Sequence, residues 1–136
     1  MESQELRIGN LVTLGSHNED FQKVEGLTEN MVKLPDSTNN LWVHKSMIYG
    51  VPLTPEILEM CGFENWGKFY EHSDTIVYVM HNIIDGSSNF EIQIDGVNKF
   101  YPCIDNEAYC WSEFKYLHQL QNLYFALTGY ELEINL

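Results

Sequence analysis

The residues of this chain that could bind a metal or act as a nucleophile are scattered along it. Five histidines are present: His17, His44, His72, His81 and His118. None of them shows the paired spacing that places zinc ligands on one face of a helix. Cys103 and Cys110 are seven residues apart, and no second pair accompanies them. We therefore expect no metal site.

Motifs of nucleophilic or phosphate chemistry do not stand out in the sequence. It lacks a Gly-x-Ser-x-Gly nucleophile elbow, and Asp-Gly-Ser-Ser at 85–88 lacks the lysine and the helix of a phosphate-binding loop. Neighbouring acids such as Glu131 and Glu133, or Asp105 and Glu107, are expected to face solvent. We assign no catalytic residue and no cofactor. An enzymatic function stays possible, because catalytic groups converge in space rather than in sequence.

Charge is the strongest compositional feature. Twenty acidic against seven basic residues give a net charge of −13, divided into −3 over residues 1–52 and −10 over residues 53–136. Such a chain is repelled by nucleic-acid phosphates and by anionic membranes, so neither is an expected partner. The acidic surface serves solubility, or it steers the chain to a basic partner.

Cysteine usage and the opening residues indicate the compartment. An odd number of cysteines without framework spacing predicts free thiols at Cys61, Cys103 and Cys110 in a reducing environment. No stretch approaches the roughly 18 apolar residues of a membrane span, and residues 1–5 are polar and acidic, unlike a signal peptide. We expect a soluble, cytoplasmic protein.

Residues 1–52 predict a small all-β subdomain. Four short stretches have strand patterning, at 6–15, 21–27, 31–34 and 41–44. Closely spaced short strands without a helix predict an SH3-like barrel or a curled sheet. Gly9-Asn10 interrupts the first stretch and predicts a bulge or bend there.

Residues 53–136 predict an α+β subdomain. Thr54-Pro55-Glu56 favours a helix start and Gly62 a helix end, which indicates a short linker helix. An antiparallel meander should follow, with strands at 68–71, 74–80 and 90–95, a return through 99–101, and turns at 85–88 and 95–96. The second strand should be buried on both faces and the third on one. Residues 132–136 alternate and predict a last strand.

One long C-terminal helix should pack across that meander. Apolar residues at 117, 120, 123, 124 and 127 form a stripe, and Gly129 ends the helix. The opposite face carries His118, Gln119, Gln121 and Asn122. These side chains merely face water, or they bond to neighbouring loops and fix the helix, or they offer an uncharged surface to a partner or a polar ligand. We expect this face to look outward and take it as a candidate binding site.

Aromatic side chains supply a second candidate. Most of the three tryptophans and eight tyrosines should lie in the core. Trp42, with His44 beside it, and Trp66 are the candidates for exposure. Because tryptophan and tyrosine dominate binding hot spots, we add Trp42 and His44 to the candidate binding residues.

Three blocks of sequence span the chain. They are Leu-Arg-Ile-Gly-Asn-Leu-Val at 6–12, Val-Pro-Leu-Thr-Pro-Glu-Ile-Leu at 51–58 with Cys-Gly-Phe at 61–63, and His-Gln-Leu-Gln-Asn-Leu-Tyr-Phe-Ala-Leu-Thr-Gly at 118–129. They resemble a family of small proteins from phages and integrated mobile elements of Bacteroides-type bacteria. The resemblance implies an origin and no mechanism. Residues 65–111 carry no such resemblance, so specificity that varies among relatives would lie there.

Three functions follow as hypotheses. We favour a non-catalytic accessory protein that binds a basic surface of a host protein, for which interference with a defence enzyme would be a natural use. The alternative is a small-ligand protein that captures a nucleotide signal between the two halves, where only Arg7 and six lysines could bind the anion. The third is a metal-dependent hydrolase with clustered acids. A homodimer through the meander edge or the helix is also open.

Overall fold

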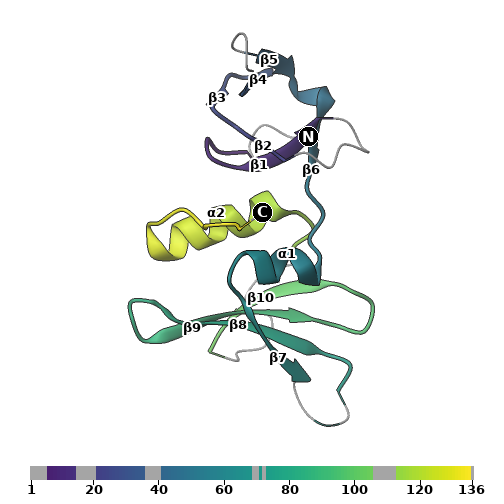
Figure 1. Cartoon of the computed structure of the whole chain (residues 1–136), viewed down its shortest axis with the longest axis vertical. Helices are drawn as coiled ribbons and strands as arrows, with labels where there is room; N and C mark the ends of the chain where they lie inside the picture. Colours follow the sequence, from purple (N-terminus) through teal and green to yellow (C-terminus); the bar gives the residue numbers. More distant parts are fainter. Residues whose placement is uncertain are drawn as a thin grey trace. The chain divides into compact units, whose positions relative to one another are not determined.

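The structure is a computed structural model that describes residues 6–14, 21–35, 41–68, 71, 73–105 and 113–135. Within these ranges the fold is mixed, with ten strands in three antiparallel sheets and one long helix near the C-terminus (Figure 1). The chain divides into two compact units. The first contains residues 1–52 and 116–123, and the second contains residues 53–115 and 124–136.

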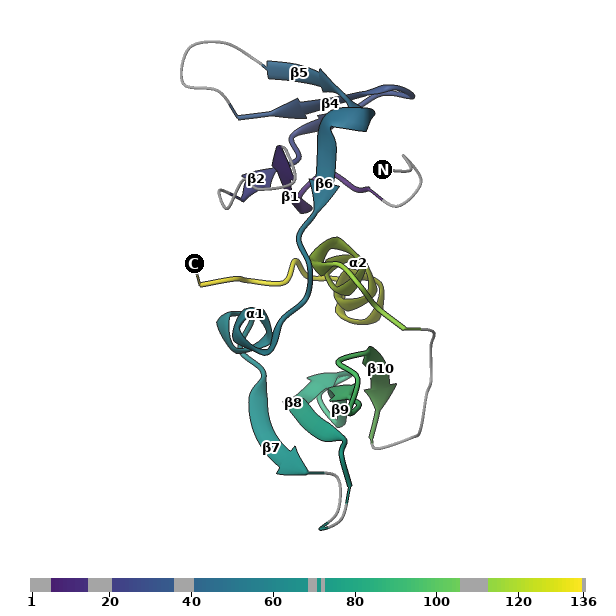
Figure 2. The ribbon, with the colours of Figure 1, turned by 90° about the vertical axis from the view of Figure 1, so that its right-hand side faces the viewer.

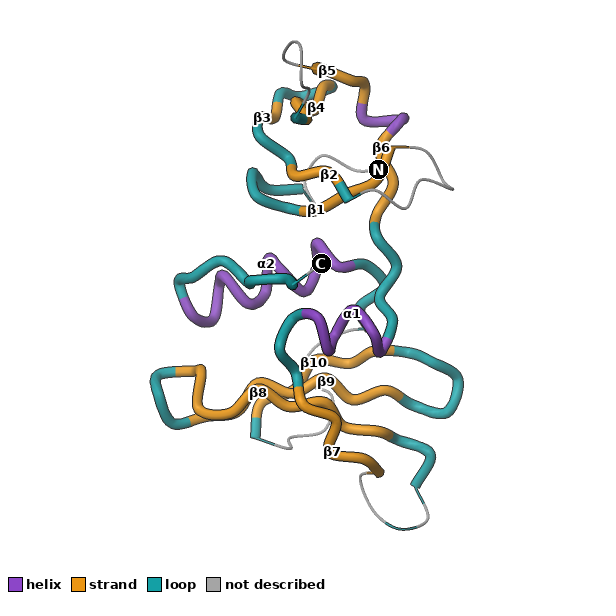
Figure 3. Tube along the Cα trace, in the orientation of Figure 1, coloured by secondary structure: helices purple, strands orange, loops and turns teal. Residues whose placement is uncertain are grey.

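Two three-stranded sheets make up most of the first unit (Figure 3). Their strands are β1 (Leu11–Leu14), β2 (Gln22–Lys23), β3 (Gly26–Leu27), β4 (Met31–Leu34), β5 (Leu41–His44) and β6 (Ile48–Gly50). The orders are β2-β1-β6 and β3-β4-β5, and a 3-10 turn at Lys45–Met47 leads from β5 to β6. Both sheets contribute to one apolar core, formed by Leu6, Val12, Val24, Val32, Leu34, Val43 and Ile48.

The strands predicted at 31–34 and 41–44 are confirmed as β4 and β5. The stretch predicted at 6–15 forms a strand only from Leu11, because the chain turns before it, with Gly9 at a φ of 100°. The bend predicted at Gly9-Asn10 is thereby confirmed. The stretch at 21–27 forms two short strands. Between them the Val24 N–H donates to the Asn10 carbonyl at 2.8 Å and the Glu25 N–H to the Lys33 carbonyl at 2.9 Å, so the chain passes from one sheet to the other.

A four-stranded antiparallel sheet and a short helix make up most of the second unit (Figure 2). The elements are α1 (Pro55–Met60), β7 (Glu64–Lys68), β8 (Ile76–Ile84), β9 (Ser88–Ile94) and β10 (Phe100–Ile104). The strand order β10-β9-β8-β7 follows the chain, as a meander does, and α1 lies over one face of the sheet. The α1 start is as predicted: the Thr54 hydroxyl accepts the Ile57 N–H at 3.2 Å, and Pro55 is the first helical residue.

Burial in the meander departs from the sequence prediction at one strand. β8 is covered on both faces as expected, because Val77, Tyr78 and Val79 are buried in succession. β9 was predicted to have a solvent face, and this is wrong: Glu91 and Gln93 are only 2% and 5% exposed. Strand alternation shows which residues share a face but not whether the polar face is covered. In the structure, both faces of β9 are buried.

The first and last strands predicted for residues 53–136 also differ. The edge strand β7 ends at Lys68, where the predicted strand at 68–71 begins, and residues 69 and 70 lie outside the described ranges. The turns predicted at 85–88 and 95–96 are confirmed as the connections from β8 to β9 and from β9 to β10.

The C-terminal helix α2 runs over Leu117–Thr128 and ends at Gly129, whose φ is 77°, as predicted. The strand predicted at 132–136 is wrong over the described residues. Residues 131–135 join no ladder, although the Asn135 N–H donates to the Met60 carbonyl at 2.9 Å. Neither helix in the described ranges has the length and apolar character needed to traverse a bilayer.

Candidate binding surfaces

The candidate binding face of α2 does not look outward. His118 is fully buried and Gln121 is 2% exposed, whereas Gln119 and Asn122 are partly buried. The prediction of an outward face is therefore wrong, because a segment distant in sequence covers it.

That segment is the turn before β1. Asn122 Oδ1 accepts a hydrogen bond from Asn10 Nδ2 at 2.8 Å and another from Arg7 Nε at 3.2 Å. Gln121 Oε1 accepts the backbone N–H of Leu11 at 2.8 Å. Because Asn10 is fully buried, its amide needs such a partner. The side-chain amides of Gln121 and Asn122 therefore supply hydrogen-bond acceptors for N–H groups of the turn that are partly shielded from water.

The first turn of α2 uses the other two residues of the face. Gln119 Oε1 accepts the N–H of Tyr116, the residue before the helix, at 3.0 Å. This is the reciprocal half of a capping box, in which the third helical residue reaches back to the cap. The His118 ring stacks on the Tyr116 ring, with centroids 5.6 Å apart and planes 11° apart. The alternative in which these side chains bond to neighbouring parts of the chain is the one that the structure shows for Gln119, Gln121 and Asn122.

Trp42 and His44 lie together on one face of β5, two residues apart, and both are exposed. Trp42 is 44% exposed and stands opposite Lys33 of β4, with Gly26 of β3 next in the same row. The outer edge of its indole lies over Gly26. His44 Nδ1 accepts the Ser46 N–H at 3.1 Å and caps the 3-10 turn.

A second exposed tryptophan belongs to a cluster on the edge of the meander. Trp66 of β7 is 57% exposed. Its indole Nε1 donates to Glu64 Oε2 at 3.4 Å, and its ring lies 4.8 Å from the His81 ring at an angle of 45°. His81 Nε2 lies 3.2 Å from the same Glu64 oxygen. We call these three residues the β7 edge cluster.

A bulge in β7 shapes the backbone beside the cluster. The pairing with β8 shifts between Asn65 and Lys68, and Gly67 takes a φ of 77°, where side chains are disfavoured. Asn65 Oδ1 accepts the Gly67 N–H at 2.7 Å and holds that conformation. Bulges of this kind re-aim side chains at the edges of sheets.

Sequence reasoning predicted the exposure of Trp66 but not its two partners. Glu64 and Trp66 are two residues apart on one strand, so strand alternation could have placed them together. His81 belongs to another strand. Its position depends on the register of β8 against β7, which the bulge shifts. No local pattern in the sequence carries that information.

Cys61 and Cys103 are buried thiols that form no disulfide, as predicted. Cys110, His17 and His72 lie outside the described residues. Burial raises the pKa of Cys61 to about 12. In the part of the chain that the structure describes, no three His, Cys, Asp or Glu side chains are grouped so that they could hold a metal ion.

Comparisons of the chain with protein-family models, with curated proteins and with solved structures found no match.

Proposed function

We propose that this chain is a non-catalytic accessory protein of a phage or mobile element, and that it binds a basic surface of a host protein through the β7 edge cluster. The phage origin rests on the resemblance of the blocks at 6–12, 51–63 and 118–129. Interference with a host defence enzyme is the use that we propose for the contact.

The single observation that carries the proposal is the exposed indole of Trp66 with neighbours that orient it. Tryptophan is enriched among residues that dominate binding energy, since it combines a large apolar area with a polar N–H. Glu64 and His81 hold the ring on the outer strand of the sheet. An oriented ring loses less conformational freedom on binding than a mobile one.

The edge position adds a backbone surface. In the described sheet β7 has β8 as its neighbour on one side, and its other side carries no strand. An extended segment of a partner could pair with such an edge, with side-chain pockets providing selectivity.

Charge supports the choice of a basic partner. The net charge of residues 53–136 is −10, and this range contains all three residues of the β7 edge cluster. Complementary charge accelerates encounter and is screened by salt. We therefore expect the association rate constant to fall about tenfold or more between low and moderate ionic strength.

We also propose that the first unit is SH3-like, with two curled sheets around one core rather than a closed barrel. Three features support this likeness. The strands are short, and the two sheets share one core. The chain also crosses between the sheets at Val24 and again at the 3-10 turn. In such a module Trp42 and His44 would form a separate contact surface, which the host protein bound at the β7 edge cluster does not use.

Affinity capture from Bacteroides-type host cells tests the proposal, with wild-type chain and two variants as bait. Trp66→Ala should lose the partner, whereas Trp42→Ala removes a similarly exposed tryptophan from the first unit and should retain it. Circular dichroism and thermal melts establish that both variants fold.

The purified partner then allows quantitative measurement. Glu64→Gln should weaken binding because it removes a negative charge beside Trp66, while the remaining amide oxygen can still accept the indole N–H. A partner captured equally by wild type and Trp66→Ala would show that the cluster is not the contact. An affinity that does not change with salt would contradict the basic partner.

A further inference from the structure

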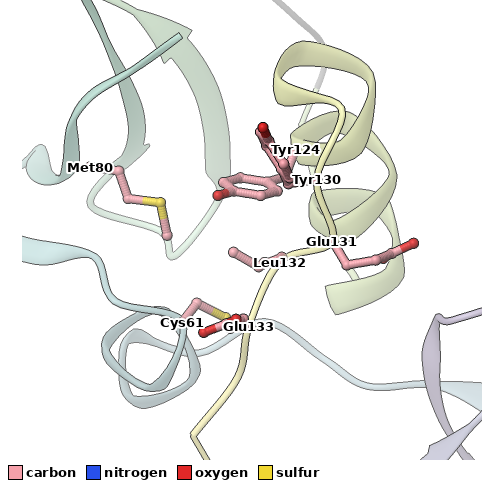
Figure 4. A pocket seen from close by; sticks show the side chains of 7 residues that line it. All are labelled: Cys61, Met80, Tyr124, Tyr130, Glu131, Leu132 and Glu133. Atoms are coloured by element: carbon pink, nitrogen blue, oxygen red, sulfur yellow. The ribbon is translucent and has the colours of Figure 1, made fainter. Parts of the chain in front are cut away.

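A cavity of about 550 Å³ lies within the second unit (Figure 4). Its walls come from the end of α1, from β8, from the later turns of α2 and from the segment that follows α2. A volume of this size suits a small molecule or one long side chain. The chemistry of the lining then decides which one.

The lining combines two phenol rings with two carboxylates. Tyr124 and Tyr130 supply the rings, Glu131 and Glu133 supply the carboxylates, and no Lys or Arg is among the lining residues. Aromatic faces and carboxylate oxygens both attract cations. An anion such as a nucleotide phosphate would be repelled here, whereas a positively charged organic group would be attracted.

The arrangement of these groups leaves room for such a ligand between them. The Glu133 and Cys61 side chains both line the cavity, and Figure 4 draws them at one end of it. Figure 4 draws Tyr124 and Tyr130 at the other end, with Leu132 between the two ends. Leu132 and Cys61 are buried, so they form an apolar base. This base would contact the alkyl groups of an organic cation, while Glu133 and Tyr130 stay accessible from solvent.

Hydrogen bonds hold the wall that follows α2. The Thr128 hydroxyl donates to the Tyr124 carbonyl at 2.8 Å and accepts the Tyr130 N–H at 3.1 Å. Farther along, the Asn135 N–H donates to the Met60 carbonyl at 2.9 Å. The segment with both glutamates is therefore tied at each end, and a ligand would meet a wall that is already in place.

We propose that this cavity binds an organic ammonium or guanidinium cation, whose charge lies between the tyrosine rings and the Glu133 carboxylate. Two sources present this chemistry, a free small amine and an Arg or Lys side chain of another protein. The proposal does not rest on Trp66 or on the host-protein contact.

Titration of the labelled full chain, followed by amide NMR, tests the proposal with choline as the probe. Its uncharged isostere dimethylbutanol has nearly the same shape and serves as the matched control. Choline should shift the amide signals of residues 124 and 130–133 and bind about tenfold more tightly than dimethylbutanol. Equal affinities for the two probes, or shifts confined to other residues, would overturn the proposal.

Two substitutions distinguish binding in the cavity from a general attraction of cations to the acidic chain. Glu133→Gln and Tyr130→Leu should each weaken choline binding about fivefold to tenfold. Tyr130 is 74% exposed and Glu133 is exposed, so neither change should unfold the chain. Glu71→Gln removes the same charge from an exposed residue outside the lining and should leave binding unchanged. If Glu71→Gln and Glu133→Gln weaken binding equally, bulk charge explains the affinity and the proposal fails.

The same titration with N-acetylarginine amide distinguishes the two sources. Tighter binding of this probe than of choline assigns the cavity to a side chain of a partner protein, and the reverse assigns it to a free amine. Absence of binding by both probes would overturn the proposal.

Discussion

The side-chain amides of Asn10 and Asn122 are joined by a hydrogen bond of 2.8 Å across 112 residues of sequence. The bond connects the turn that precedes the first strand to the last helix. Arg7 Nε donates to the same Asn122 oxygen. The buried amides thus hold the N-terminal turn against α2 and complete the first unit.

Replacement of Asn122 by alanine should destabilise the chain by about 1–3 kcal/mol, because it leaves the buried Asn10 amide without this acceptor. Urea denaturation measures the change. Asn135→Ala removes an exposed amide and should cost little. A double-mutant cycle with Asn10→Ala should show that the two substitutions are not additive. Additive costs would mean that the two amides do not stabilise each other.

Gln119→Ala should lower the free energy of unfolding by about 1 kcal/mol, since it removes the acceptor for the Tyr116 N–H at the helix start. Gln119→Glu keeps an acceptor oxygen and should retain most of the stability. The comparison is made by thermal melting of both variants. Equal losses in both would argue against capping as the role of Gln119.

Gly26→Ala should destabilise the first unit by about 1 kcal/mol and alter the fluorescence of Trp42. A methyl group at this position would lie 3.1 Å from the Trp42 ring and 3.2 Å from Lys33 Cβ, so the indole must move. The double variant Gly26→Ala with Trp42→Ala provides the control. In that background the added methyl group should cost less. An unchanged cost would show that the row of Gly26, Lys33 and Trp42 is not tightly packed.

Cys61 should make stability fall as the pH rises from about 9 to about 12. Burial raises its pKa from 9.0 to about 12, so the native state keeps a proton that the unfolded state releases in this window. The contribution is fully present below pH 9 and is lost as the pH approaches the native value, by up to about 4 kcal/mol.

Cys61→Ala should therefore flatten the decline. Urea denaturation of wild type and Cys61→Ala at several pH values compares the slopes, and the constant cost of the smaller side chain cancels. Tyr78 adds its own alkaline decline in both proteins. Its pKa is raised by burial and then by the carboxylates of Glu59 and Glu56. Parallel curves for the two proteins would contradict the assignment to Cys61.

Local signals in the sequence predict the elements whose ends they mark. Thr54 and Pro55 locate the start of α1, Gly129 locates the end of α2, and the turn residues at 85–88 locate a hairpin. These features depend on neighbours a few residues away, so they form without contacts from distant parts of the chain. Exposure of Trp42 and Trp66 was also predicted correctly.

Burial of polar faces was not predictable in the same way. Glu91 and Gln93 alternate with apolar residues as on a solvent-facing strand, yet both are buried. His118 and Gln121 were placed on the outer face of α2 and are covered. In each case the sequence pattern identifies the face, whereas only packing determines what lies against it.

The sequence by itself determined the acidic charge, the free thiols, the meander and the positions of the helix ends, because composition and local hydrogen bonding suffice for these. Tertiary structure alone decided that the amides of α2 hold the N-terminal turn and that Glu64 and His81 orient Trp66. It also brought Tyr124, Tyr130 and Glu133 around one cavity. The physical reason is that such contacts join residues across strand registers and long separations, where each pairing depends on how the whole unit packs.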